Sequence, residues 1–257
     1  MLQKTLEDII REEVETVRAR RIILDQLEGG LKTGAELREK IATDTKAQMM
    51  LEGASKKDIG NVEITSPKLY YNTKRLEELG IVVSWKQAQY RLFELEPKAI
   101  HPVRRALGIS KPLLYITSLS RPEDQRPFVQ WLTNNPYFNP RKMLIFVEAR
   151  HWIRGVMRLA DRFIPDDSFR VWTTEWIEVP DNVIGADDEK EYGNLQKVVD
   201  FLESSIIDNI FIHDMVIDLT LGPSLVTLAM AKLAAEYSIT AFHVTRYDKT
   251  NAEISYY

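Results

Sequence analysis

Residues 69–82, LYYNTKRLEELGIV, are the most informative segment for the fold of the N-terminal half. Drawn as a helix, with about 100° between successive residues, it separates into an apolar side and a polar side. The apolar side carries Leu69, Thr73, Leu76 and Leu79. The opposite side carries Tyr71, Lys74, Arg75 and Glu78, with Lys68 at its edge. One side is therefore suited to a protein core, and the other offers cations and a phenol to a partner.

Residues on both sides of this stretch mark the limits of the helix. Ser66 and Pro67 are suited to be its N-cap and its first helical residue, and Gly80 is positioned to end it. Strand-like runs follow over 81–85 and 90–95, with a short polar connection between them. This spacing predicts a hairpin directly after the helix.

The sequence upstream predicts further helices. Residues 1–30 are expected to be helical, and Thr33 with Glu36 has the spacing of a capping box that opens a short helix over 34–42. Residues 43–65 are polar and charged, and they allow either an extension of this helix or an inserted loop.

The order of these elements resembles the winged helix-turn-helix of ArsR/MarR-like repressors, over roughly residues 16–98. The segment 69–82 matches the recognition helix and the first wing strand. The resemblance implies binding of double-stranded DNA by a homodimer across two half-sites. In that family the second helix runs almost directly into the recognition helix, so residues 43–65, with Lys56 and Lys57, are a departure. The DNA-binding candidates are Lys68, Tyr71, Lys74, Arg75, Lys86 and Arg91.

The C-terminal half has a different pattern, in which strands alternate with helices. Strand-like runs occupy 113–117, 143–148, 171–179, 209–219 and 240–246. Helical patterns occupy 152–163, 195–206 and 223–237. This alternation predicts an α/β Rossmann-like domain with a mostly parallel sheet. We therefore expect two domains, a mainly α domain over 1–110 and an α/β domain over 111–257, with 101–111 read as a connector.

A polar turn, DLTLGPS over residues 218–224, links the run 209–219 to the helix that follows. Free N–H groups and the dipole at the start of a helix favour an anion such as phosphate. Thr220 and Ser224 add hydroxyls, and Gly222 permits close approach of the backbone. Small polar residues also cap helices that bind nothing, so a purely structural role for Thr220 and Ser224 stays open.

A second polar turn, TSLS over residues 117–120, follows the first strand of this half. The carboxyl ends of parallel strands meet at one edge of a sheet, which is where ligands bind in open α/β folds. We therefore expect both turns at that edge. Arg150 and Arg154, after the second strand, are expected to face the same crevice.

Together the two turns resemble those of the CARF domain, the CRISPR-associated Rossmann fold, over roughly residues 111–247. The resemblance implies a homodimer that binds a cyclic oligoadenylate across its two-fold axis. The winged helix here precedes the sensing domain, and Leu221 and Leu225 stand where the family often has a glycine and a cation. The ligand-binding candidates are Thr117, Ser118, Leu119, Ser120, Arg150, Arg154, Asp218, Thr220, Gly222, Pro223 and Ser224.

Composition excludes several classes of function. The 257 residues contain no cysteine, and the four histidines lack ligand spacing, so we expect neither a disulfide nor a metal site. No apolar run reaches membrane-spanning length and no signal peptide is apparent, which predicts a cytoplasmic protein. Residues 1–110 carry 19 Lys and Arg against 17 Asp and Glu, hence +2, while the rest carry 15 against 21, hence −6. The positive net charge of residues 1–110 suits a first half that contacts DNA.

These observations predict a ligand-responsive transcription regulator without catalytic residues or cofactors. Neither Gly-x-Gly-x-x-Gly nor Gly-x-Ser-x-Gly occurs, which argues against a dehydrogenase and a serine hydrolase. Two alternatives stay open. One is a ring nuclease that cleaves cyclic oligoadenylate, with Thr117, Ser118 and Arg150 or Arg154 positioning the substrate. The other is a protein-interaction and dimerisation module, favoured where Glu77 and Glu78 cancel the nearby cations.

Overall fold

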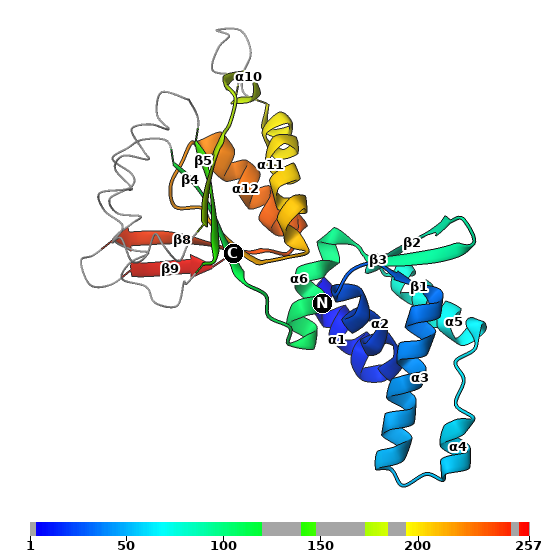
Figure 1. Ribbon diagram of the computed structural model, residues 1–257. Helices are drawn as coiled ribbons and strands as arrows, with labels where there is room; N and C mark the ends of the chain where they lie inside the picture. The colour runs from blue at the N-terminus through cyan, green and yellow to red at the C-terminus, as the bar shows by residue number, and fades with distance from the viewer. Residues whose placement is uncertain (1–3, 120–139, 148–172, 185–193, 248–251, 257) are drawn as a thin grey trace. The chain divides into compact units, whose positions relative to one another are not determined.

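The computed structural model describes residues 4–119, 140–147, 173–184, 194–247 and 252–256 (Figure 1). The chain divides into two compact units, Met1–Ser110 and Lys111–Tyr257, called unit 1 and unit 2 below. No helix among the described residues combines the length and the apolar character needed to cross a lipid bilayer.

Unit 1 is mainly helical, with a small antiparallel sheet. Its helices are α1 (Leu6–Thr16), α2 (Arg18–Glu28), α3 (Gly34–Leu51), α4 (Lys56–Gly60), α5 (Ser66–Glu78), the 3₁₀ turn η1 (Pro97–Ala99) and α6 (Ile100–Leu107). Its strands are β1 (Lys32–Thr33), β2 (Val82–Gln87) and β3 (Tyr90–Leu95), in the order β1-β3-β2. The predicted hairpin is confirmed, although β2 runs to Gln87 and leaves only residues 88 and 89 in the turn.

Helix α5 has the two sides that the wheel predicts. Leu69 and Leu76 are buried on one side, together with Asn72 and Thr73. The helix ends as expected, because Gly80 has φ +69°, a conformation that glycine adopts without strain. The predicted N-cap is wrong by one residue. Thr65 is the N-cap and makes no side-chain capping bond, while Ser66 Oγ accepts a hydrogen bond from Arg38 at 2.8 Å.

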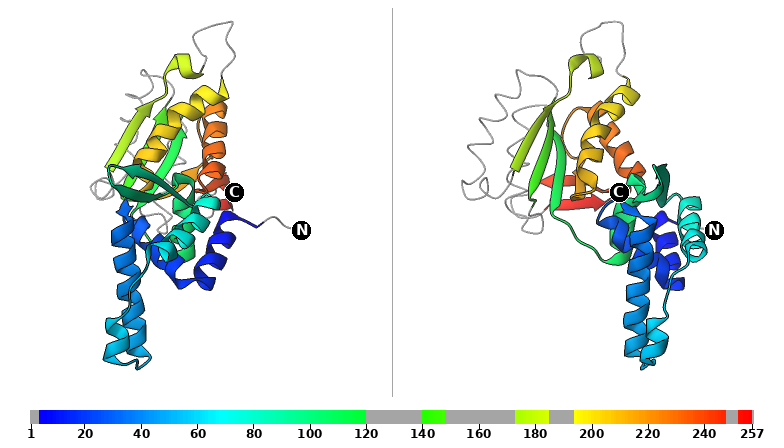
Figure 2. Two further views of the ribbon diagram at one scale, coloured as in Figure 1. Left: turned by 90° about the vertical axis from the view of Figure 1, so that its right-hand side faces the viewer. Right: turned by 45° about the vertical axis from the view of Figure 1, so that its right-hand side comes forward.

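Helix α3 begins where the sequence predicts but runs nearly twice as far. Thr33 and Glu36 form the predicted capping box. The helix continues to Leu51 instead of ending at residue 42, because residues 43–51 include good helix formers and neither glycine nor proline. The short helix α4 lies beside the far end of α3 in both views of Figure 2. Residues 43–65 therefore hold both a helix extension and an added helix.

The connector predicted over 101–111 is wrong, because α6 occupies most of it. Pro102 lies in the first turn, where proline is compatible with a helix, so it does not stop α6. The helix packs against α1 and α2, with Val103 buried. Arg104 is buried as well, and its Nε donates to Glu28 Oε1 at 2.8 Å. Gly108, at φ +72°, ends the helix.

The described part of unit 2 contains a six-stranded sheet, and its mostly parallel arrangement is as predicted. Its elements are β4 (Leu113–Leu119), β5 (Lys142–Val147), β6 (Thr173–Glu178), α10 (Asp181–Ile184), α11 (Leu195–Ile210), β7 (Asp214–Asp218), α12 (Ser224–Glu236), β8 (Thr240–Tyr247) and β9 (Ala252–Tyr256). The strand order is β6-β5-β4-β7-β8-β9. Helices α11 and α12 cover one face (Figure 1). The arrangement is compatible with a Rossmann-like domain.

Three details of unit 2 differ from the sequence prediction. Strand β4 continues through Leu119, so Thr117 and Ser118 belong to the strand and not to a loop. Strand β7 begins at Asp214, since Asn209 and Ile210 end α11. Strand β9 was not predicted, and it pairs antiparallel with β8. The helix predicted over 152–163 lies outside the described residues.

Candidate nucleic-acid and ligand-binding sites

All six predicted DNA contacts are exposed on the surface of unit 1, and two of them, Arg75 and Arg91, also donate hydrogen bonds to carboxylates. On α5, Tyr71 is 69% exposed and Lys68 is also exposed. The side chain of Lys74 is 53% exposed, and its Nζ lies 3.9 Å from Glu78 Oε1. Lys86 of β2 is exposed near the tip of the hairpin. A partner can therefore reach these side chains without any unfolding of unit 1.

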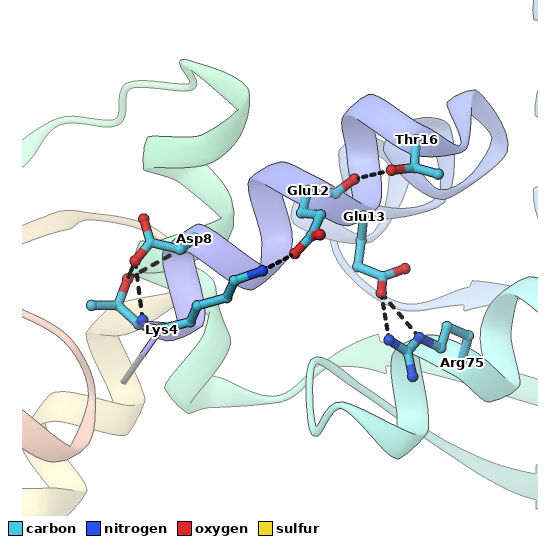
Figure 3. Close-up of polar contacts among 7 residues, drawn as sticks. Lys4, Asp8, Glu12, Glu13, Thr16 and Arg75 are labelled. Atoms are coloured by element: carbon cyan, nitrogen blue, oxygen red, sulfur yellow. Dashed lines mark hydrogen bonds and ion pairs between the residues drawn. The ribbon is translucent and has the colours of Figure 1, made fainter. Parts of the chain in front are cut away.

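Arg75, the fifth predicted contact, is held by a carboxylate of α1 (Figure 3). Its Nε and Nη2 donate to Glu13 Oε1 at 3.0 and 2.8 Å. The other oxygen of this buried carboxylate is paired with Arg20 of α2. Arg20 Nε in turn donates to Asn72 Oδ1 of α5 at 3.3 Å. One carboxylate thus joins α1, α2 and α5.

Arg91 of β3, the sixth predicted contact, lies against aromatic rings. Its guanidinium carbon is 5.8 Å from the centre of the Tyr70 ring and 5.7 Å from that of Phe93. Its Nε donates to Ser84 Oγ at 2.9 Å, and its Nη2 donates to Glu77 Oε1 at 3.3 Å. Arg91 thereby connects the hairpin to α5.

Acidic neighbours offset part of this positive surface but not all of it. Glu77 pairs with Arg91 and Glu78 pairs with Lys74. Exposed ion pairs of this kind contribute at most about 1 kcal/mol, so a phosphate group can replace them. Within the described parts of the chain, Lys68 and Lys86 form no ion pair. The face therefore retains free positive charge.

In unit 2, the ends of β4 and β7 meet as expected for neighbouring parallel strands. Ser118 Oγ donates to the Leu221 carbonyl oxygen at 2.9 Å. Gly222 has φ +108°, and a Cβ at this position would collide with Ser118 Oγ and lie 2.7 Å from Ser118 Cβ. Only glycine therefore allows the turn to pack so closely on β4.

Asp218 fixes the same turn from inside the sheet. Its Oδ2 accepts a hydrogen bond from the Tyr115 hydroxyl at 2.6 Å, and its Oδ1 accepts one from Thr220 N at 2.8 Å. Thr220 Oγ1 accepts a hydrogen bond from Val244 N at 2.9 Å. Burial raises the pKa of Asp218, although the hydrogen bonds from Thr220 and Tyr115 act in the opposite direction. These polar groups are occupied within the fold and shape the turn.

The accessible part of this candidate site is the end of the turn. Thr220, Gly222 and Pro223 are partly exposed, and Ser224 is exposed at the start of α12. Pro223, the N-cap, provides no side-chain cap, so the first amides of the 13-residue helix are available to an anion. Ser120, Arg150 and Arg154 lie outside the described residues.

Two further candidates, Thr117 and Leu119, are buried in β4. Strand side chains alternate, so both face away from Ser118, on the other side of the sheet. Among the described residues, Thr117 Oγ1 has no hydrogen-bond partner. No group of three or more His, Asp or Glu in this part of the chain could hold a metal ion.

Sequence reasoning missed the two side chains that organise these sites. Tyr115 lies in an apolar run and bonds to a residue 103 positions away. Glu13 lies on a charged helix and bonds to a residue 62 positions away. Neither contact leaves a local signal, because both depend on how distant elements pack.

The sequence matches no protein-family model and no curated protein. Solved structures to which it is similar include the following three. Csm6 from Enterococcus italicus, bound to cyclic hexa-2'-fluoro-hexa-dAMP, is 8% identical, with TM-score 0.39 over 53% of this chain and 34% of that one. Can2 from Sulfobacillus thermosulfidooxidans, in complex with cyclic tetra-adenylate, is 15% identical, with TM-score 0.36 over 56% and 36%. Protein VC1899 from Vibrio cholerae is 13% identical, with TM-score 0.38 over 56% and 35%. The chain spans about a third of the length of these proteins.

Proposed function

We propose that this protein is a DNA-binding regulator whose DNA affinity responds to a nucleotide ligand. Unit 1 is its DNA-binding part, a winged helix-turn-helix in which α3 and α5 are the two helices and the β2–β3 hairpin is the wing. The observation that carries the proposal is the face of α5, where Lys68, Tyr71 and Lys74 are exposed. The leucines on the other side of α5 are buried in unit 1, so the face with Lys68, Tyr71 and Lys74 points to solvent.

The exposed residues of α5 and of the hairpin would contact different parts of a DNA duplex. An α-helix fits the major groove of B-DNA, and α5 would present Tyr71 and Lys74 there. Lys68 and the hairpin residues Lys86 and Arg91 would contact phosphates, which give affinity without sequence preference. Arg75 would make a bidentate contact through Nε and Nη2 by exchanging Glu13 for a phosphate or a guanine edge.

Unit 2 is the sensing part, similar to a CARF domain and binding a cyclic oligoadenylate. The support in the structure is the turn 219–223 at the carboxyl edge of β4 and β7, with the uncapped start of α12 beside it. Amide groups at a helix N-terminus bind phosphate, and a cyclic oligoadenylate presents several phosphodiesters. Ser118 and Asp218 would position this turn, and Thr220 to Ser224 would meet the ligand.

Ligand binding would act on DNA binding through a shift between two states of a homodimer. A ligand held across the two-fold axis favours one arrangement of the two sensing units, and hence one spacing of the two α5 helices on DNA. Couplings of this kind typically change affinity about 5- to 150-fold.

Fluorescence anisotropy with a labelled duplex, selected from a random library against the purified chain, tests the proposal. We expect binding that weakens with salt and a dissociation constant that changes at least about fivefold with cyclic tetra-adenylate. Linear tetra-adenylate is the matched control and should have no effect. Absence of duplex binding with and without ligand would contradict the proposal. Conversion of labelled cyclic tetra-adenylate to linear products would instead support the ring-nuclease alternative.

A further inference from the structure

Tyr71 presents an aromatic ring at the centre of the exposed face of α5, where it is 69% exposed. Lys68 lies three residues before it and Lys74 three residues after it. On an α-helix this spacing places each lysine about 60° to one side of the ring and about 4.5 Å along the axis. Both lysines are exposed. The face therefore has a ring in the middle and a cation on each side.

A buried cation holds the Tyr71 ring in this position. The guanidinium carbon of Arg20 lies 6.0 Å from the centre of the ring, which is a cation–π distance. Arg20 is itself buried, and it is bonded to Glu13 of α1 and to Asn72 of α5. The ring thus rests on a side chain that is fixed between three helices. Little side-chain entropy is left for the ring to lose when it binds a partner.

We propose that Tyr71 contacts the methyl group of a thymine in the major groove, an inference that rests on the proposed DNA binding by unit 1. With Lys68 on a phosphate and Lys74 in the groove, the ring between them would lie against base edges. The C5-methyl of thymine is the apolar group that base pairs present there, and the other groups are hydrogen-bond donors and acceptors. An aromatic ring gains by covering this methyl, so Tyr71 would select thymine at one position of each half-site.

Replacing each thymine of the selected duplex by uracil, one at a time, tests this contact because it removes a methyl group and keeps the base pair. Anisotropy with the full chain should show about three- to fivefold weaker binding at one position of each half-site, the effect of one buried methyl group. There, 5-methylcytosine paired with guanine should bind more tightly than cytosine by a similar factor. A duplex that binds but tolerates uracil at every position would overturn this inference alone. Absence of any bound duplex would overturn the proposed function with it.

Substitutions assign the thymine preference, the ratio of the dissociation constants for the uracil and thymine duplexes, to the ring. Tyr71→Phe keeps the ring and should keep the preference. Tyr71→Ala removes the ring and should bind both duplexes equally. The matched control Tyr256→Ala, which removes a ring of β9 that is 62% exposed, should keep the preference. Loss of the preference in Y71F would assign the contact to the hydroxyl, and its persistence in Y71A would assign it to another residue. Either result would contradict the proposal.

Discussion

Arg75 is the predicted DNA contact that a neighbouring side chain controls most directly. Both of its donating nitrogens bond to one oxygen of Glu13, and Arg20 occupies the other oxygen. A phosphate can bind the Nε and Nη2 edge of Arg75 only by displacing this carboxylate. Glu13 therefore acts as a positioning residue: it holds α5 against α1 and α2, and it occupies two of the nitrogens of Arg75.

Replacing Glu13 by glutamine should release Arg75 for DNA. We expect E13Q to bind a duplex about three- to tenfold more tightly at 0.1 M salt and to steepen the salt dependence by up to about one phosphate contact. The matched control is Glu12→Gln, which removes the neighbouring exposed charge that pairs with Lys4 at 2.6 Å (Figure 3). If both variants bind DNA equally, Arg75 is not a DNA contact. Thermal unfolding should record a loss for E13Q, because Arg20 loses a buried partner.

His101 should make unit 1 sensitive to mild acid. It is buried in α6, and burial, with Arg104 and Arg105 nearby, lowers the pKa of His101 from 6.5 to about 3. Below pH 6.5 the imidazole of His101 is therefore protonated in the unfolded chain but remains neutral in the folded chain. The free energy of unfolding should fall as pH decreases from 6.5 toward 3, by about 1.4 kcal/mol per pH unit in the steep part.

The check is hydrogen exchange of the α2 and α6 amides between pH 6.5 and 5, corrected for the intrinsic exchange rate. His101→Leu should flatten this pH dependence, because the unfolded chain then has no imidazole at this position to take up a proton. A slope equal in H101L and the parent would show that other groups cause the effect. The range stops at pH 5 because carboxylates titrate below it.

At the scale of elements, the turn between β7 and α12 depends on one glycine. An alanine at position 222 would need φ near +108° and would collide with Ser118. We expect Gly222→Ala to lower the free energy of unfolding of unit 2 by about 2–5 kcal/mol, from backbone strain and overpacking together. Gly60→Ala is the control, since nothing lies within 4 Å of a Cβ there. Hydrogen exchange of the β4 and β7 amides measures the loss, and Ser118→Gly should restore part of it.

Elements with a clear apolar period could be predicted, and elements without one could not. Helix α5 was predictable because its leucines recur on one side and a glycine follows it. The far half of α3 has few buried residues and so gives no apolar period. The end of α11 was assigned to β7, because a continuous apolar run does not distinguish a buried helix end from a strand. The edge at which the end of β4 meets the turn 219–223 followed from the order of parallel strands. The hydrogen bonds of Asp218 could not be predicted, because they depend on how the folded chain packs.

At the scale of the whole molecule, the proposal requires a dimer that holds one ligand. We expect native mass spectrometry of the purified chain to give twice the 29.8 kDa mass of one chain. With cyclic tetra-adenylate added, the expected mass gain is one ligand for every two chains. A monomer that binds one ligand would contradict the two-fold arrangement while leaving DNA binding by unit 1 open.

The net charge of the whole chain, −4, does not favour the proposed DNA binding. The proposal therefore depends on the local arrangement of cations on α5 and the hairpin. The most direct test is the salt dependence of duplex binding, measured by anisotropy for the parent, for K68Q/K86Q, and for the charge-matched control R21Q/K232Q. We predict that K68Q/K86Q reduces the slope of log K against log salt by about 2, at about 0.9 for each lost phosphate contact, while the control follows the parent. Equal losses in both double variants, or a parent chain without salt-dependent binding, would contradict the account.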